Sequence, residues 1–385
     1  MTVERYQAVV VGAGLVGAAA ALALGRRGLR VALIERQPPP VPDDAWDTRI
    51  YAISPASQRF LEGLGAWQRL AADRIQPVFR MDVAGDAAGA LRLDAYAAGV
   101  SHLATILESG RLQAALWQAL EADGSVALHC PAGIALIERG ERHTRIVLDD
   151  GATLETELVI GADGAASHIR TWAGLASTLT PYGQSGVVAN FACERPHRGT
   201  AVQWFFDGDI LAWLPLPGNR LSMVWSTSPA HADELVARDA AALAEQVRAA
   251  GHDRLGALER LTPAAAFPLR LIRVDAVVAP GVALIGDAAH GVHPLAGQGV
   301  NLGFGDAEAL VDVLAQHRRV PLGDLRILQA YARQRAEPVQ RMQALTHGLH
   351  HLFAEPRAAW LRNAGLSVVD RLPPLKAALV REAMS

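Results

Sequence analysis

A glycine-rich segment near the amino terminus constrains the fold of this chain more than any other feature. The sequence GAGLVG occupies residues 12–17, directly after an apolar run at residues 7–11. An alanine-rich stretch follows at residues 15–27, and a second apolar run at residues 30–35 ends on an acidic residue. This pattern predicts a strand, a helix and a second strand, the βαβ unit of a Rossmann-like domain.

The chemistry of this segment indicates a dinucleotide. The glycines at positions 12, 14 and 17 permit a tight turn and let the backbone approach a pyrophosphate, beside the positive end of a helix dipole. Glu35, at the end of the second strand, can accept hydrogen bonds from both ribose hydroxyls of an adenosine. The acidic residue at this spacing makes the motif specific for a dinucleotide, but the motif alone leaves NAD and FAD open.

Two later turns favour FAD. Asp163 lies in Gly161-Ala162-Asp163-Gly164, and Asp287 follows Gly286, in each case after an apolar strand. Aspartates at successive strand ends suit a long ligand that crosses the domain. Asp287 is placed to bind the ribitol of FAD.

A second glycine-rich turn follows the Gly286-Asp287 turn and opens a helix near Asn301. Backbone N–H groups at the start of this helix would point at the pyrimidine edge of the flavin ring. Reduced flavin carries negative charge there, so the helix dipole would stabilise the reduced anion.

Composition excludes several classes of function. With 385 residues the chain can hold two domains, and its net charge of −3 gives no reason to expect nucleic-acid binding. The single lysine, Lys376, excludes chemistry that needs a lysine in the body of the fold. Cys130 and Cys193 lie far apart, so we expect no metal site and a reducing, cytoplasmic compartment. The uncharged run at residues 8–25 is short for a membrane span, and we expect neither a signal peptide nor a transmembrane helix.

The middle of the chain has a different texture. Strands rich in aromatic and branched residues are predicted at residues 187–193, 201–206, 210–214 and 221–225, which suggests an antiparallel sheet. A single helix is predicted at residues 232–249, and a mostly helical region begins near residue 322.

The predicted fold class is therefore α/β, with three parts. A discontinuous Rossmann-like FAD-binding domain comprises residues 1–75, 100–178 and 265–325. An inserted antiparallel-sheet domain that binds substrate comprises residues 76–99 and 179–264. Residues 326–385 form a helical C-terminal region.

Several segments carry a family resemblance. They are DTRIYAISPASQRFLEGLGAW at 47–67, ESGRLQAALWQAL at 108–120, GADGAASHIR at 161–170 and GDAAHGVHPLAGQGVNLGFGDAEAL at 286–310. The chain resembles the class A FAD-dependent aromatic hydroxylases with the para-hydroxybenzoate hydroxylase fold, and within them the ubiquinone-biosynthesis hydroxylase family. The match covers nearly the whole chain. One departure is Ala166, where the family often has asparagine.

The resemblance implies a set of cofactor contacts. The adenosine and pyrophosphate would lie at Gly12, Gly14, Gly17 and Glu35. The remaining contacts it implies are Arg49 and Arg111 to the flavin or its phosphates, Asp163 in a turn used for both FAD and NAD(P)H, Asp287 to ribitol, and Pro294, Gly297, Gly299, Val300 and Asn301 along the isoalloxazine.

The family chemistry needs little acid–base catalysis, so no catalytic side chain is named. NAD(P)H reduces FAD, O2 forms a flavin hydroperoxide, and a hydroxyl is transferred to the electron-rich ring of a polyprenylated phenol or quinol. Trp204, Phe206, Trp213 and Leu214 are candidates for the apolar substrate wall, or equally for the sheet core. His293 is a candidate contact to flavin or substrate, or equally a structural residue of the turn.

Alternatives remain open at this stage. They are a hydroxylase of another small aromatic compound, an isoprenoid reductase or epoxidase, and a non-catalytic flavoprotein scaffold. A lipophilic substrate suggests peripheral contact with the inner membrane and association with other ubiquinone-biosynthesis proteins. Membrane contact through the C-terminal leucines and Phe353 competes with packing of the same helix onto the FAD-binding domain, which we favour.

Overall fold

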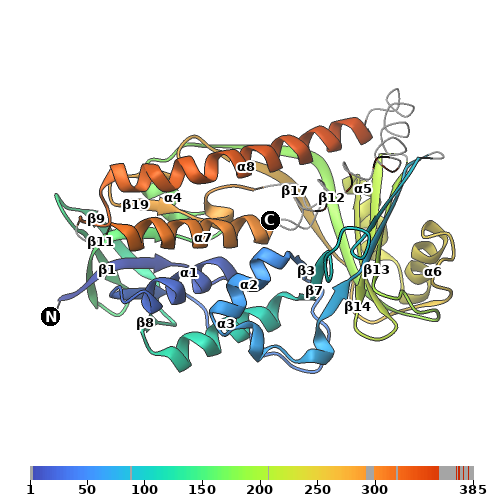
Figure 1. Ribbon diagram of the computed structural model, residues 1–385, viewed down its shortest axis with the longest axis horizontal. Coiled ribbons are helices and arrows are strands. Elements are labelled where there is room, and N and C mark those ends of the chain that lie inside the picture. The colour runs from blue at the N-terminus through green and yellow to red at the C-terminus, as the bar shows by residue number, and fades with distance from the viewer. Residues whose placement is uncertain are drawn as a thin grey trace.

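The computed structural model describes residues 3–86, 89–206, 208–291, 299–317 and 320–354, together with residues 370, 372, 376 and 380. They form two domains side by side along the long axis of the molecule (Figure 1). We refer to them as the Rossmann-like domain and the sheet domain.

The Rossmann-like domain is built on a mostly parallel sheet. Its central strands are buried on both sides, because helices or a hairpin cover each face, and their sequences are accordingly continuous apolar runs. The strands, in spatial order, are β18 (Val278–Ala279), β19 (Val282–Leu284), β11 (Thr153–Gly161), β1 (Val3–Val11), β2 (Val31–Ile34) and β8 (Val126–His129). A hairpin of β9 (Ile134–Arg139) and β10 (Thr144–Leu148) extends from β11. The sequence Asp149-Asp150-Gly151 between two alternating segments predicts a hairpin, and β10 and β11 do pair antiparallel on either side of this turn.

One large apolar cluster fills one side of this sheet. Helix α1 (Leu15–Arg26) is almost entirely buried there, which explains its lack of a polar face. The helices that join it are α3 (Ser109–Asp123), α7 (Gly299–Gln316) and α8 (Leu325–Ala354), with α2 (Pro55–Gly63) at its edge. Short α4 (His168–Trp172) lies with the hairpin on the opposite side. The sequence predicts helices at residues 15–27, 55–64 and 110–122, and α1, α2 and α3 confirm them within two residues at each end.

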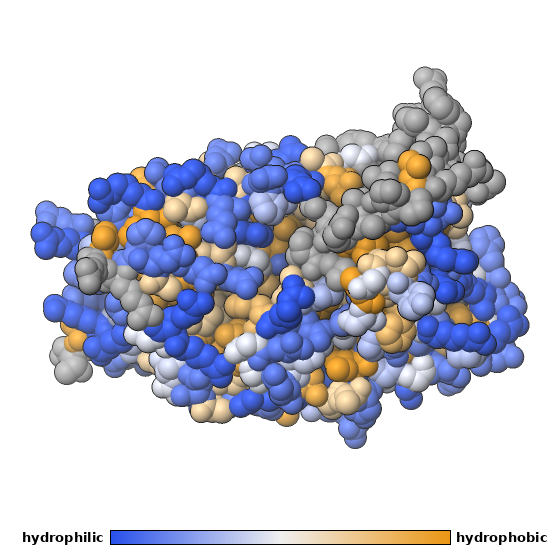
Figure 2. Space-filling model, in the orientation of Figure 1, coloured by the Kyte–Doolittle hydropathy of each residue, from blue (hydrophilic) through white to orange (hydrophobic). Residues whose placement is uncertain are grey.

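Helix α8 runs along α7 (Figure 1), and its inner residues Ile327, Leu328 and Tyr331 are buried in the same cluster. Hydrophilic residues dominate the outer side of the molecule over this helix (Figure 2). The first part of α8 therefore packs on the Rossmann-like domain, whereas the packing favoured above for the C-terminal leucines and Phe353 stays a prediction. Leu345 is 46% exposed, whereas the side chains of Leu349, Leu352 and Phe353 lie outside the described part.

A small three-stranded sheet lies where the two domains meet. It consists of β3 (Ile50–Ile53), β7 (Ala104–Glu108) and β4 (Gln76–Val78). Two short 3-10 helices, Trp67–Arg69 and Ala72–Arg74, precede β4. Residues 76–78, which the sequence placed in the sheet domain, thus pair with β7 instead.

The sheet domain is an eight-stranded, mainly antiparallel sheet. The strands, in order, are β16 (Leu258–Arg260), β12 (Ser177–Cys193), β15 (Arg220–Thr227), β14 (Asp209–Leu216), β13 (Thr200–Phe206), β5 (Arg80–Ala84) and β6 (Ala90–Asp94), with β17 (Ala265–Val274) also paired to β12. All four predicted strands are confirmed. Residues 265–274, which the sequence assigned to the FAD-binding domain, form β17 and extend the ladder of β12.

Helices α5 (Pro229–Ala237) and α6 (Ala240–Ala250) cover the face of this sheet that is turned away from the Rossmann-like domain (Figure 1). The prediction of one helix at residues 232–249 was wrong. Arg238 is extended, and the Asp239 side chain accepts a hydrogen bond from Ala242 N, so a new helix is capped and begins there. In the described part of the chain, no helix is long and apolar enough to span a membrane.

Candidate functional site

The first and second glycine motifs are in direct contact. A Cβ on Gly17 would lie 2.0 Å from the Gly12 carbonyl oxygen, and one on Gly12 would lie 2.5 Å from that of Ala162. Gly12 also has a φ of 101°, which side-chain-bearing residues rarely adopt. Both glycines are therefore required by the way the start of α1 packs on the Gly161–Gly164 turn.

Gly14 has a different role from its neighbours. A Cβ there would meet nothing within 4 Å, so open space lies beside the amino terminus of α1. Glu35 is close to this space, because its carboxylate accepts hydrogen bonds from Ala13 N (2.7 Å) and Gln37 N (3.0 Å). The arrangement leaves room for a pyrophosphate over the helix end, with the predicted ribose acceptor beside it.

The Gly286–Asp287 turn forms the third part of the site. Asp287 lies in a 3-10 helix, Gly286–Ala288, at the end of β19, and its side chain is exposed. Val16 of α1 packs against this turn and against α7. A Cβ added to Gly286 would lie 3.3 Å from the Val16 side chain, and a Cβ added to Gly303 of α7 would lie 2.5 Å from it. The helix of the first motif, the third motif and the start of α7 thus converge on one place.

Asp163 has a structural role in the second motif. Its carboxylate accepts hydrogen bonds from Ser167 Oγ, His168 N and Ile169 N, and so caps α4. Arg170 is buried and donates to the carbonyl oxygens of Ala165 and Ala288. It joins the second motif to the third, and the departure at Ala166 leaves these contacts intact.

Sequence reasoning missed a buried ionic network behind Asp287. Asp306 of α7 is fully buried and accepts hydrogen bonds from Gly286 N (3.0 Å), His290 Nε2 (2.6 Å) and Arg335 Nε (2.7 Å). It therefore holds the Gly286–Asp287 turn, α7 and α8 together. The sequence contains one sign of this network. Asp306 lies within an apolar stretch of the helix predicted from about Asn301, and a buried carboxylate needs a partner.

The charges of this network shift one another. Burial alone would lower the pKa of His290, but the Asp306 carboxylate raises it above its usual value. Burial alone would raise the pKa of Asp306, but His290 and Arg335 lower it. The favoured state is a charged imidazolium paired with a carboxylate.

Two predicted flavin contacts come together at Tyr51, another residue that the sequence did not single out. The guanidinium carbon of Arg49 lies 5.4 Å from the centre of the Tyr51 ring. Burial raises the pKa of Tyr51; the Arg49 guanidinium opposes this shift and the Asp287 carboxylate adds to it. Arg49 and Asp287 therefore act on the same phenol from β3 and from the turn after β19.

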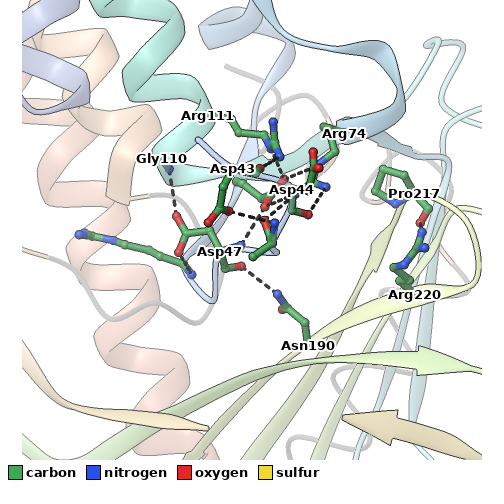
Figure 3. Close-up of polar contacts among 12 residues, drawn as sticks. Asp43, Asp44, Asp47, Arg74, Gly110, Arg111, Asn190, Pro217 and Arg220 are labelled. Atoms are coloured by element: carbon green, nitrogen blue, oxygen red, sulfur yellow. Dashed lines mark hydrogen bonds and ion pairs between the residues drawn. The ribbon is translucent and has the colours of Figure 1, made fainter. Parts of the chain in front are cut away.

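Arg111 is engaged elsewhere. It donates to the buried Glu108 carboxylate (3.0 Å) and to the Asp43 carbonyl oxygen. Glu108 also accepts hydrogen bonds from two of the three guanidinium nitrogens of Arg74, Nε and Nη2, both at 2.8 Å. Figure 3 shows Arg74 and Arg111 converging on the loop of Asp43 and Asp44. In this structure Arg111 anchors the loop before β3, and a contact with the flavin remains a prediction.

Val300 and Asn301, at the start of α7, are buried. The Asn301 amide donates to the Ala52 carbonyl oxygen and accepts from Ser54 N, both at 2.9 Å, and thereby ties the helix to β3 and α2. Val300 packs into the apolar cluster, and Gly299 is the first residue of the helix. Pro294, Gly297 and His293 lie outside the described residues.

The aromatic candidates for the substrate wall face α5 and α6. Trp204 and Trp213 pack edge to face with ring centres 4.9 Å apart, in the cluster that includes residues of both helices, and Phe206 packs against it. Trp213 is 2% exposed and lies against Gly251 at the end of α6. Of the two alternatives given above for Trp204, Phe206 and Trp213, packing in the core of the sheet domain is the one that the structure shows. Leu214 points the other way and packs with Trp46 where the domains meet.

The residues present fit FAD. Open space over the α1 terminus suits the pyrophosphate, and the exposed Asp287 carboxylate suits the ribitol. In the described part of the chain, no group of three or more metal-binding side chains is found.

Comparison with known proteins agrees with this geometry. A family model described as FAD binding domain matches residues 5–346. The chain is 36% identical to 3-demethoxyubiquinol 3-hydroxylase of Escherichia coli K12, over 100% of both chains. It is 33% identical to ubiquinone hydroxylase UbiL of Rhodospirillum rubrum, over 98% of this chain and 89% of that protein. Human ubiquinone biosynthesis monooxygenase COQ6 is also 33% identical, over 96% and 91%.

Solved structures show the same fold. PqsL, a probable FAD-dependent monooxygenase of Pseudomonas aeruginosa, superposes with a TM-score of 0.79 at 24% identity, over 94% of this chain and 99% of its own. The p-nitrophenol 4-monooxygenase PnpA of Pseudomonas putida gives 0.78 at 17% identity, over 99% of both chains.

Fold and site together define a flavoprotein monooxygenase. The chain belongs to the family of FAD-dependent aromatic-ring monooxygenases that includes the ubiquinone-biosynthesis hydroxylases. FAD is its cofactor, and NAD(P)H is the electron donor of the family.

Proposed function

We propose that this enzyme hydroxylates the aromatic ring of a polyprenylated phenol or quinol intermediate of ubiquinone biosynthesis. The observation that carries the proposal is the relationship to 3-demethoxyubiquinol 3-hydroxylase, which extends over the full length of both chains. A relationship of this extent includes the sheet domain, which we expect to bind the substrate, as well as the cofactor motifs.

The contributions of the protein itself are binding, orientation and exclusion of water. Bound FAD supplies the oxygen-transfer chemistry, with electrons from NAD(P)H and oxygen from O2. The α1 terminus at Gly14 would hold the pyrophosphate, Glu35 the ribose and Asp287 the ribitol. Arg49 would lie at the flavin beside Tyr51. Because no proton has to be removed from a weakly acidic carbon, no strongly basic side chain is required.

The interface between the domains suits an apolar ring. Leu214 and Trp46 pack there with Ile50, Ala52 and Leu103, in a cluster shared by the two domains. Such a surface excludes water from the reacting ring. We place the substrate ring at this interface, on the face of the sheet opposite Trp204 and Trp213.

Peripheral membrane contact is part of the proposal, since the substrate tail partitions into lipid. An open cleft of about 670 Å³ lies at the edge of the sheet domain. Phe79 and Tyr96 on its wall are 48% and 94% exposed, and Arg198 lines it as well. Exposed aromatic rings beside a cation suit the headgroup region of an anionic bilayer. Flotation with anionic vesicles should fall when Phe79 and Tyr96 are both changed to Ser.

The function is tested in cells that lack the gene and in the purified enzyme. Deletion should cause one under-hydroxylated polyprenyl intermediate to accumulate, and the wild-type gene should restore the quinone pool. The purified holoenzyme with NADH and isotopically labelled O2 should add one labelled oxygen atom to that intermediate. An unchanged quinone pool would exclude the ubiquinone pathway, and loss of a prenyl double bond would indicate a reductase.

A further inference from the structure

Asn190 of β12 lies where the sheet domain meets the Rossmann-like domain. It pairs across the ladder with Ser222, which in turn pairs with Leu214. Directly paired residues project from the same face of a sheet, so all three lie on the face opposite Trp213. Asn190 and Ser222 are both fully buried. A fully buried amide requires an explanation, because each of its polar groups needs a hydrogen-bond partner.

The orientation of the Asn190 amide follows from its partner. Asn190 Nδ2 donates to the Asp47 carbonyl oxygen at 2.8 Å, and a carbonyl can only accept, so the NH2 group must face Asp47. Asn190 Oδ1 therefore faces away and has no hydrogen-bond partner within the described part of the chain. An unpaired buried acceptor costs about 1–3 kcal/mol. The contact with Asp47 is thus made in spite of this cost.

Every polar group of Asp47 is engaged. Its two carboxylate oxygens accept from Arg49 N (2.9 Å) and Gly110 N (3.0 Å), and its own N–H donates to Glu108 Oε1 (2.8 Å). Figure 3 shows Asn190 reaching Asp47 from the sheet while Gly110 approaches from α3. Asp47 thereby links the sheet domain, the start of α3 and the backbone of Arg49.

The loop that carries Asp47 has a rigid base. Glu108 accepts hydrogen bonds from Nε and Nη2 of Arg74, and the Trp46 ring lies 3.9 Å from the carbon of that guanidinium. A base of this kind holds the loop firmly on the Rossmann-like side. The hydrogen bond from Asn190 adds a fixed point from the sheet side.

We propose that Asn190 is a positioning residue, which holds Asp47 and so fixes Arg49 relative to the substrate-binding sheet. The inference rests on the proposed function, in that it takes Arg49 to lie at the flavin and the substrate to lie on the sheet. Small displacements of an orienting group can lower the rate of a reaction by up to about a hundredfold. Asn190 would thus set how efficiently reduced flavin is used for product.

Stability alone does not explain the amide. Replacing Asn190 with leucine, which is of similar size, would remove the unpaired acceptor but leave the Asp47 carbonyl oxygen without its donor, so the gain and the loss in stability offset each other in part. If Asn190 were only structural, Asn190→Leu would leave the flavin unchanged. If Asn190 positions Arg49, the same variant would fold normally but alter the flavin environment.

The test compares Asn190→Leu and Asn190→Ala with Ser222→Ala, a buried control on the adjacent strand whose hydroxyl has no partner among the described residues. The holoenzymes are measured for melting temperature, FAD content, visible circular dichroism of bound FAD, anaerobic reduction by NADH, and product formed per NADH consumed. We expect both Asn190 variants to retain FAD, to show altered visible dichroism, and to form about tenfold less product per NADH. Ser222→Ala should match the wild type in FAD content, visible dichroism and anaerobic reduction, which do not depend on the substrate-binding face.

The inference is overturned if both Asn190 variants match Ser222→Ala in dichroism and in reduction. It is also overturned if their losses only follow a lower melting temperature or FAD content. The flavin readouts need no quinol substrate. Altered dichroism with no hydroxylation by the wild type would therefore refute the proposed function while supporting the role of Asn190.

Discussion

Two buried carboxylates, Glu108 and Asp306, hold two loops of the flavin site in different ways. Each receives a main-chain N–H from the loop it supports: Glu108 from Asp47 and Asp306 from Gly286. The partners of Glu108 are two arginines, which stay charged at all relevant pH values. The partners of Asp306 are one arginine and a histidine, whose charge changes near neutral pH.

The two networks also differ in what they connect. The Asp306 network stays within the Rossmann-like domain and joins the turn of Asp287 to α7 and α8. The Glu108 network continues through Asp47 to Asn190 of the sheet domain. The difference indicates that the cofactor half of the site is built as one block, whereas the loop of Arg49 is shared between the domains.

The largest effect is expected for Asp306→Asn. The substitution leaves Arg335 and His290 with no counter-charge at a fully buried position, which typically costs about 3–5 kcal/mol. Chemical denaturation should show this loss, and purified protein should contain less FAD. A variant with wild-type stability would contradict the view that this network holds the cofactor half together.

A smaller loss is expected for Glu108→Gln. Arg74 and Arg111 are 13% and 21% exposed, so water can solvate them in part, and we expect about 2 kcal/mol. The flavin spectrum should change more than the FAD content, because the loop of Arg49 loosens while the Gly14 and Asp287 contacts persist. Equal loss of FAD in this variant and in Asp306→Asn would remove the proposed distinction between the networks.

The third prediction concerns pH. The pKa of His290 is raised above its usual 6.5, so the stability it contributes is fully present below pH 6.5 and is lost as pH rises through the higher folded value. The pKa of Asp306 is lowered from 3.8, so its contribution is present above that pH and is lost as pH falls through the lower folded value. The difference in free energy of unfolding between wild type and His290→Gln should therefore be greatest between pH 3.8 and pH 6.5, where both contributions are present. It should shrink in alkaline solution. A constant difference up to pH 9 would show that His290 is not charged.

The smallest effect is expected for Asp312→Asn, also on α7. Asp312 pairs with Arg27, but both side chains are about half exposed, and such pairs contribute about 0–1 kcal/mol. The variant shows whether burial, and not charge alone, distinguishes Asp306. A loss as large as that of Asp306→Asn would argue against it.

Local patterns were sufficient to predict much of this architecture. The glycine motif, the apolar runs and Glu35 predicted the βαβ unit, because each depends on residues close together in the chain. The networks of Glu108 and Asp306 were not predicted, since Arg74 and Arg335 lie 34 and 29 residues from their carboxylate partners. Only folding brings these groups together.

The sheet domain shows a second limit. Alternation along a strand indicates which residues share a face, and Trp204 and Phe206 do share one. It does not indicate which face meets the other domain. In this sheet α5 and α6, and not the Rossmann-like domain, cover the face that carries the aromatic residues. Asn190, on the face toward the Rossmann-like domain, was consequently not singled out.

The pairing of β12 with β17 has a mechanical consequence. The two strands run together from Ser177 and Val274 to Val188 and Ala265, along the route by which the chain enters and leaves the sheet domain. A hydrogen-bonded ribbon resists bending much more than two separate tethers would. We therefore expect the two domains to be braced against large opening motions. Under the proposed function, the substrate would then enter through local movements of loops.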